Sequence, residues 1–114
     1  MVGATLVEIG DARGTDISAL EAAINAQTAA VVWFQGDDQP RRHPAGPGYR
    51  HRQRAHDVPV IIDGAAQLPP TENLWTWTGM GAALAVFSGG KDLHGPQPTG
   101  LIVGRAGAHE RRCA

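Results

Sequence analysis

The sequence predicts an α/β fold in which a mostly parallel sheet is flanked by helices. Apolar runs of strand length recur along the chain without regular polar alternation, which is typical of parallel strands that are buried on both faces. Segments of helix length separate most of these runs, as crossover connections between parallel strands require. With 114 residues, the chain can form one domain with a modest core.

Apolar runs define the expected strands of this sheet. The main strands are expected at residues 28–34, 58–62, 82–87 and 101–103. A β-branched run at 5–9, which ends at Gly10, predicts a further short strand near the N-terminus. The sequence therefore predicts a sheet whose strands are distributed along the whole chain.

One amphipathic helix is expected between the first two apolar runs. Thr15 or Asp16 can cap its N-terminus, and the helix is expected to extend to Asn25. Its apolar face is formed at helical spacing by Ile17, Leu20 and Ile24.

Composition excludes several classes of protein. Hydrophobic residues make up 42% of the chain and the net charge is −1, which indicates neither disorder nor a general polyanion partner. The single cysteine, Cys113, excludes an intramolecular disulfide and agrees with a reducing compartment. No apolar run has the length of a membrane span, and the N-terminus has no secretory pattern. A soluble cytoplasmic protein is expected.

The segment at 37–55 interrupts the α/β pattern. It contains three prolines and five of the ten basic residues, and it lacks the aliphatic residues that a packed crossover helix needs. Three interpretations remain open for it. It forms an exposed, irregular loop, which the composition favours; or its arginines at 41–54 bind nucleic acid phosphates; or it is the product of a shifted reading frame.

Polar residues follow two of the predicted strands. Asp63 ends the run at 58–62, and Ser88, two glycines and Lys91, the only lysine, follow the run at 82–87. Ligands bind at the carboxyl ends of strands in open α/β sheets, and a neutral lysine amine can attack a carbonyl carbon. The simpler interpretations are a solvated loop lysine, a carboxylate that caps a turn and a turn hydroxyl. Metal ligands are not clustered, so no metal site is expected.

These motifs carry a family resemblance. The segments IIDGAAQLPP at 61–70, FSGGK at 87–91 and GPQ at 95–97 together resemble the pyridoxal-phosphate enzymes of fold type I. Within them, the chain is most similar to the group that contains selenocysteine synthase (seryl-tRNA selenium transferase) and D-glucosaminate-6-phosphate ammonia-lyase. Members of this group are much longer, so the chain resembles a central slice of their large domain.

The resemblance covers residues 3–36 and 56–105, and it fails over 37–55 and after Arg105. Residues 1–105 are therefore interpreted as a partial large domain and 106–114 as a divergent tail. The family fold also implies that the strand at 101–103 returns antiparallel to the strand before it.

The resemblance implies a role for each candidate residue. Lys91 would hold pyridoxal 5'-phosphate covalently and then remove the α-proton of the substrate. Asp63 would pair with the pyridine nitrogen, Ala65 would lie against the ring, and Gln67 would reach the phenolic oxygen. Ser88 would bind the cofactor phosphate together with the amides of the glycine turn.

The implied reaction is α-proton abstraction followed by β-elimination on an amino-acid substrate. One branch of the group then transfers selenium to a tRNA-bound product, whereas the other releases ammonia. The resemblance also implies a homo-oligomer for the full-length form. Two alternatives stay open: a non-catalytic remnant of such an enzyme, or a fragment that binds RNA, such as tRNA, through 41–54.

Overall fold

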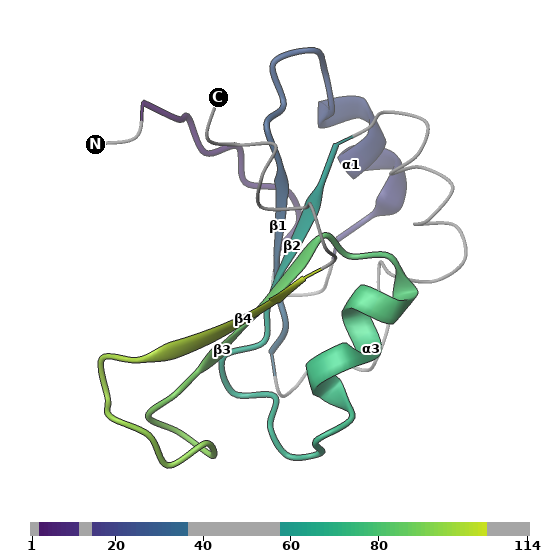
Figure 1. The fold of residues 1–114 in the computed structure, drawn as a ribbon. Coiled ribbons are helices and arrows are strands. Elements are labelled where there is room, and N and C mark those ends of the chain that lie inside the picture. The colour runs from purple at the N-terminus through teal and green to yellow at the C-terminus, as the bar shows by residue number, and fades with distance from the viewer. Residues whose placement is uncertain (1–2, 12–14, 37–57, 105–114) are drawn as a thin grey trace.

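The computed structural model describes residues 3–11, 15–36 and 58–104, which form a four-stranded sheet with helices beside it (Figure 1). The strands follow the order β1-β2-β3-β4, where β1 is Val31–Phe34, β2 is Val60–Asp63, β3 is Leu84–Ser88 and β4 is Gly100–Gly104. The pairs β1–β2 and β2–β3 are parallel, and β4 is antiparallel to β3. The predicted α/β class and the antiparallel return of the last strand are confirmed.

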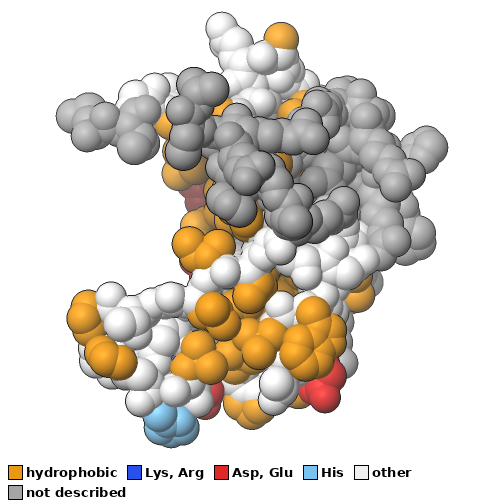
Figure 2. Space-filling view, in the orientation of Figure 1, with side chains coloured by type: hydrophobic (Ala, Val, Ile, Leu, Met, Phe, Trp, Pro, Cys, Tyr) orange, Lys and Arg blue, Asp and Glu red, His pale blue; other side chains and the backbone are white. Residues whose placement is uncertain are grey.

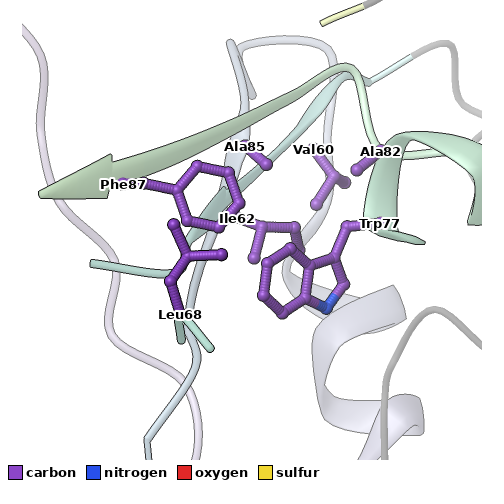
Figure 3. Close-up of a cluster of buried hydrophobic side chains, with 7 residues drawn as sticks. All are labelled: Val60, Ile62, Leu68, Trp77, Ala82, Ala85 and Phe87. Carbon is purple, nitrogen blue, oxygen red and sulfur yellow. The ribbon is translucent and has the colours of Figure 1, made fainter. Parts of the chain in front are cut away.

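One face of the sheet carries the core. The helix α3, Asn73–Met80, lies beside this face, and its Trp77 is 2% exposed. Trp77 packs with Phe87 at a ring-centroid distance of 5.7 Å. Figure 3 shows how the cluster gathers side chains from β2, β3, α3 and the segments on either side of α3. Its members are Val60, Ile62, Leu68, Trp77, Ala82, Ala85 and Phe87.

The opposite face is more open than the sequence predicts. Val32 is 45%, Phe34 is 67% and Ile102 is 66% exposed, and burial alternates along β2 and β3. The apolar runs indicated strands that are buried on both faces, but neither described helix buries this second face. Exposed apolar side chains are not confined to this face: Figure 2 shows them reaching the surface in the lower half of the molecule, over β3, β4 and α3.

The helix α1, Ile17–Ala23, begins as predicted and ends earlier. Asp16 is its N-cap: Asp16 Oδ1 accepts a hydrogen bond from the Ser18 N–H at 3.1 Å. The helix ends before Asn25 because that residue forms a turn. Asn25 N donates to Thr28 Oγ1 and Thr28 N donates to Asn25 O, both at 2.9 Å. The same turn occupies Thr28, so the strand predicted from residue 28 cannot start there; β1 begins at Val31.

The predicted strand at 5–9 is wrong. Residues 3–10 form neither helix nor strand, and Leu6 and Val7 are 83% and 68% exposed. A β-branched run becomes a strand only by pairing with a neighbour, and the described sheet consists of β1 to β4 alone. The expectations for 37–55 and 106–114 fall outside the described residues. No described helix is long and apolar enough to cross a membrane.

Candidate functional site

Asp63 is the last residue of β2 and lies at the carboxyl end of the parallel strands. Its register partners are Phe34 on β1 and Val86 on β3. Because Ile62 points into the core, strand alternation directs the half-buried Asp63 to the opposite face. Its Oδ1 accepts a hydrogen bond from the Ala65 N–H at 3.1 Å. Within the described residues, Oδ2 has no hydrogen-bond partner, so one carboxylate oxygen remains available to a ligand.

Two backbone hydrogen bonds join the end of β2 to the end of β3. Gly64 N donates to Val86 O at 2.9 Å, and Ser88 N donates to Ala65 O at 3.3 Å. Ser88 lies two residues beyond Val86, the register partner of Asp63, and therefore on the same face. Strand geometry places the Cα atoms of Asp63 and Ser88 roughly 8 Å apart. The sheet thus presents a carboxylate and a hydroxyl side by side at one edge.

Gly64 permits the close packing beneath this edge. A Cβ at Gly64 would lie 3.0 Å from Trp77 Cζ3 and 3.4 Å from Phe87 Cε1. The absence of a side chain therefore lets the core rings pack against the backbone directly after Asp63. The core and the candidate site meet at this residue.

Lys91 lies on the turn that follows β3, and its side chain is exposed. The turn is closed by Gly95 N, which donates to Gly89 O at 2.7 Å, and by His94 N, which donates to Lys91 O at 2.9 Å. No ion pair joins Lys91 to Asp63, and the Lys91 amine has no hydrogen-bond partner in the part of the chain that the structure describes. The amine is therefore accessible to a reagent or a ligand.

The two glycines of the turn are sterically required. A Cβ at Gly89 would overlap Thr99 Oγ1, and a Cβ at Gly90 would lie 2.7 Å from Gln97 Cα. Gly89 N donates to Thr99 O at 2.9 Å, so this amide already has an acceptor. The Gly90 amide has none among the described residues. Of the two amides expected to bind an anion, that of Gly90 alone lacks an acceptor in the described part of the chain.

Gln67 lies at the same end of the sheet. Its Nε2 donates to Gln35 O, just beyond β1, at 3.5 Å. Its backbone is held on both sides: Gln67 N donates to Gly64 O at 2.9 Å, and Asn73 Nδ2 donates to Gln67 O at 2.6 Å. Ala65, half-buried, lies in the turn between Asp63 and Gln67.

The structure thus gathers the backbone positions of Asp63, Ala65, Gln67 and Ser88 at one edge and places Lys91 three residues beyond Ser88. Sequence reasoning missed the segment that holds the lysine turn. Gln97 Nε2 donates to Gly90 O at 3.1 Å, and Thr99 O accepts from Gly89 N. Gln97 belongs to the GPQ motif, but only the folded turn shows what it contacts. The described residues contain no group of three metal-ligating side chains.

Comparisons with known proteins show what the chain is similar to in sequence and in fold. No family model matches the chain. The chain is 30% identical to D-glucosaminate-6-phosphate ammonia lyase of Salmonella typhimurium and 32% identical to 5'-C-glycyluridine monooxygenase-decarboxylase of Streptomyces sp.. It is 35% identical to L-seryl-tRNA(Sec) selenium transferase of Nitratidesulfovibrio vulgaris. Each match covers 90% of this chain and 24–27% of the relative.

A solved structure of D-glucosaminate-6-phosphate ammonia-lyase has the same fold in the matching region. Its TM-score is 0.71 at 29% sequence identity, and the match covers 90% of this chain and 27% of the solved chain. The chain therefore spans about a quarter of the length of the relatives that it matches. In sequence, it is similar to one segment of D-glucosaminate-6-phosphate ammonia lyase and of L-seryl-tRNA(Sec) selenium transferase, and in fold to the same segment of the ammonia-lyase.

Proposed function

We propose that this chain carries the cofactor-holding part of a pyridoxal-phosphate-dependent lyase or transferase that acts on an amino-acid substrate. One observation supports this proposal above the others. Asp63 ends β2, and the residues from Ser88 to Lys91 begin at the end of the adjacent parallel strand β3, at the carboxyl edge where open α/β sheets bind ligands. Backbone hydrogen bonds tie the two strand ends together.

The residues at this edge fit the chemistry of the cofactor. Asp63 keeps one carboxylate oxygen without a partner among the described residues, as pairing with a ring nitrogen requires. The Ser88 hydroxyl and the Gly90 N–H likewise have no described partner, and both are groups that bind phosphate oxygens. The Lys91 amine is exposed, as attack on an aldehyde requires.

Each residue then has a distinct role. Lys91 would hold the cofactor through its amine; once the substrate amine has displaced it, the freed Nζ would take the α-proton of the substrate. The Asp63 carboxylate accepts a hydrogen bond from the ring nitrogen, and its negative charge favours the protonated nitrogen. Ser88 donates to the phosphate, the small Ala65 leaves room for the ring, and Gln67 orients the ring through a polar contact. When bound, pyridoxal phosphate supplies an electron-accepting ring for the chemistry at the α-carbon.

The reaction that we infer is α-proton removal followed by loss of a β-substituent. The names of two relatives, an ammonia lyase and a selenium transferase, support this class. The third relative is named a monooxygenase-decarboxylase, so the substrate and the later steps depend on the remainder of each enzyme. We propose a homo-oligomeric, cytoplasmic enzyme for the full-length form.

Covalent labelling tests the proposal. The protein is incubated with pyridoxal 5'-phosphate at neutral pH and reduced with borohydride, and the modified peptide is identified by mass spectrometry. The chain has a single lysine, so the α-amine of Met1 is the internal reference. An ordinary lysine is more basic than an α-amine and carries less of the reactive neutral form at this pH. Preferential labelling of Lys91 therefore requires a site that holds the aldehyde there.

We expect Lys91 to be labelled in preference to Met1, and inorganic phosphate to compete with this labelling. Lys91→Arg keeps the positive charge without a nucleophilic amine and should leave only the Met1 adduct. Labelling of Met1 ahead of Lys91 in the unsubstituted protein would contradict the proposal.

A further inference from the structure

Hydrogen bonds to the backbone carbonyl groups of residues 89–91 hold the turn that carries Lys91. Gly95 N donates to Gly89 O at 2.7 Å, and His94 N donates to Lys91 O at 2.9 Å. Between them, Gln97 Nε2 donates to Gly90 O at 3.1 Å. Three consecutive carbonyl groups therefore accept hydrogen bonds from the segment 94–97.

Peptide planarity converts these contacts into an orientation for the N–H groups. The C=O and N–H bonds of a trans peptide point in opposite directions, and the described chain has cis bonds only before Pro69 and Pro70. Because Gly90 C=O points toward Gln97, the Lys91 N–H points away from Gln97. The Gly89 C=O and the Gly90 N–H belong to one peptide in the same way. Because Gly89 O accepts from Gly95 N, the Gly90 N–H points away from the segment 94–97. Neither amide has an acceptor within the described ranges.

The contact at Gly90 differs from the other two because a side chain makes it. Backbone groups form the bonds from Gly95 and His94, whereas the middle bond depends on the amide of Gln97. Gly90 has no Cβ, and an added one would lie 2.7 Å from Gln97 Cα and 2.6 Å from Gln97 Oε1. The glycine thus allows Gln97 to approach the peptide that immediately precedes Lys91.

We propose that Gln97 is a positioning residue for Lys91. By binding Gly90 O, it fixes the plane of the Gly90–Lys91 peptide, and with it the Cα of Lys91 and the direction of the Lys91 N–H. The inference rests on the proposed function, in which Lys91 reacts with a ligand aldehyde while the neighbouring amides face its phosphate. Gln97 itself touches neither group and acts through the backbone.

The single lysine makes this proposal directly measurable. Labelling with ¹⁵N-lysine gives one backbone amide signal, that of Lys91. Its order parameter is expected to be near the rigid value of about 0.85 in the unsubstituted protein and below about 0.6 in Gln97→Ala. Gln97→Glu keeps nearly the same size, but its carboxylate cannot donate, so it should behave like Gln97→Ala.

The same turn offers a matched control. Leu93 is 42% exposed, and its hydrocarbon side chain has no hydrogen bond to lose. Leu93→Ala therefore shortens a side chain two residues from Lys91 without removing a donor to the turn. The order parameter of the Lys91 amide should remain near the rigid value in this variant.

A second measurement separates positioning from simple ordering of the loop. The rates at which pyridoxal phosphate and formaldehyde modify Lys91 are compared, since formaldehyde has neither ring nor phosphate to be placed. Loss of one hydrogen bond should lower the ratio of the two rates by about threefold to tenfold in Gln97→Ala and Gln97→Glu. Leu93→Ala should leave this ratio unchanged.

The outcomes are distinguishable. An unchanged order parameter, or an unchanged rate ratio, in both Gln97 variants would overturn the positioning role. If the unsubstituted protein shows no preference of pyridoxal phosphate for Lys91, the proposed function fails. In that case, the order parameter still decides whether Gln97 orients the Lys91 peptide.

Discussion

The backbone N–H of Ser88 donates a hydrogen bond to the carbonyl of Ala65 at 3.3 Å. This bond lies beyond the last register pair of β2 and β3, Asp63 with Val86. It therefore links the turn after one strand to the end of the next, where the candidate residues are located. Changes that separate these two segments should disturb the site even when they occur in the core below it.

Gly64→Ala should cause such a separation. The new Cβ would lie 3.0 Å from Trp77 Cζ3 and 3.1 Å from Trp77 Cη2, so the ring or the turn must move. Overpacking of this kind lowers the free energy of unfolding by about 1–3 kcal/mol. Urea denaturation followed by circular dichroism measures the change.

Gly79→Ala is the matched control for this substitution. Gly79 lies within α3, and a Cβ there would meet no atom within 4 Å. Because Gly79 is the second-last residue of α3, its replacement by alanine should raise the free energy of unfolding by at most about 0.5–1 kcal/mol, the value for a helix interior. Equal effects of the two substitutions would show that the contact with Trp77 is not what constrains Gly64.

Trp77 should be the most sensitive position of the core. It is 2% exposed and packs against Phe87, so Trp77→Ala should lower the free energy of unfolding by about 3–5 kcal/mol. Trp75, on the same helix, is 58% exposed. Trp75→Ala should therefore change the free energy of unfolding by no more than about 0.5 kcal/mol. Comparable losses for the two tryptophans, measured by urea denaturation, would contradict the assignment of the core face.

The cap of α1 should titrate below the ordinary range of an aspartate. The Ser18 hydroxyl, which donates to Asp16 Oδ2 at 2.7 Å, and then the Ser18 N–H lower the pKa of Asp16. Ser18→Ala removes the larger of these two contributions and should raise the pKa of Asp16 toward its usual value. Titration of the Asp16 ¹³Cγ signal measures both values.

The lowered pKa of Asp16 has a defined consequence for stability. A carboxyl group with a depressed folded-state pKa stabilises the fold above its unfolded-state pKa, and this contribution is lost as pH falls through the folded-state pKa. The difference in stability between the unsubstituted protein and Asp16→Ala should therefore be largest near neutral pH and shrink under acid conditions. A difference that grows as pH falls would contradict the cap.

The strands could be predicted because their signals are local and strong. Uninterrupted apolar runs located β2 and β3, and the motifs around Asp63 and Lys91 indicated which strand ends carry polar groups. Their parallel pairing brings Asp63 and Ser88 to the same edge, as α/β topology requires. The predicted start of β1 was too early because Thr28 forms a turn with Asn25. Threonine occurs in both turns and strands, so its presence does not distinguish them.

Other features depend on contacts that no local pattern specifies. The run at 5–9 has the composition of a strand but no partner in the described sheet. The contact between Gln97 and Gly90 joins residues seven positions apart in the sequence and exists only because Gly90 leaves room for it. The exposed second face was not predicted either, because an apolar run does not show whether the elements that cover it are present.

We propose that Asp63 and Lys91 bind one and the same ligand. The test uses pyridoxal phosphate and its deaza analogue, in which carbon replaces the ring nitrogen. For each ligand, borohydride trapping at Lys91 is measured as a function of ligand concentration. Asp63→Asn removes the charge that pairs with the ring nitrogen and nearly preserves the shape of the side chain.

Asp63→Asn should weaken the apparent affinity for pyridoxal phosphate by about tenfold to a hundredfold, which is the range for loss of a charged hydrogen bond. The apparent affinity for the deaza analogue should not change. Equal weakening of both ligands, or of neither, would show that Asp63 does not contact the ring held at Lys91.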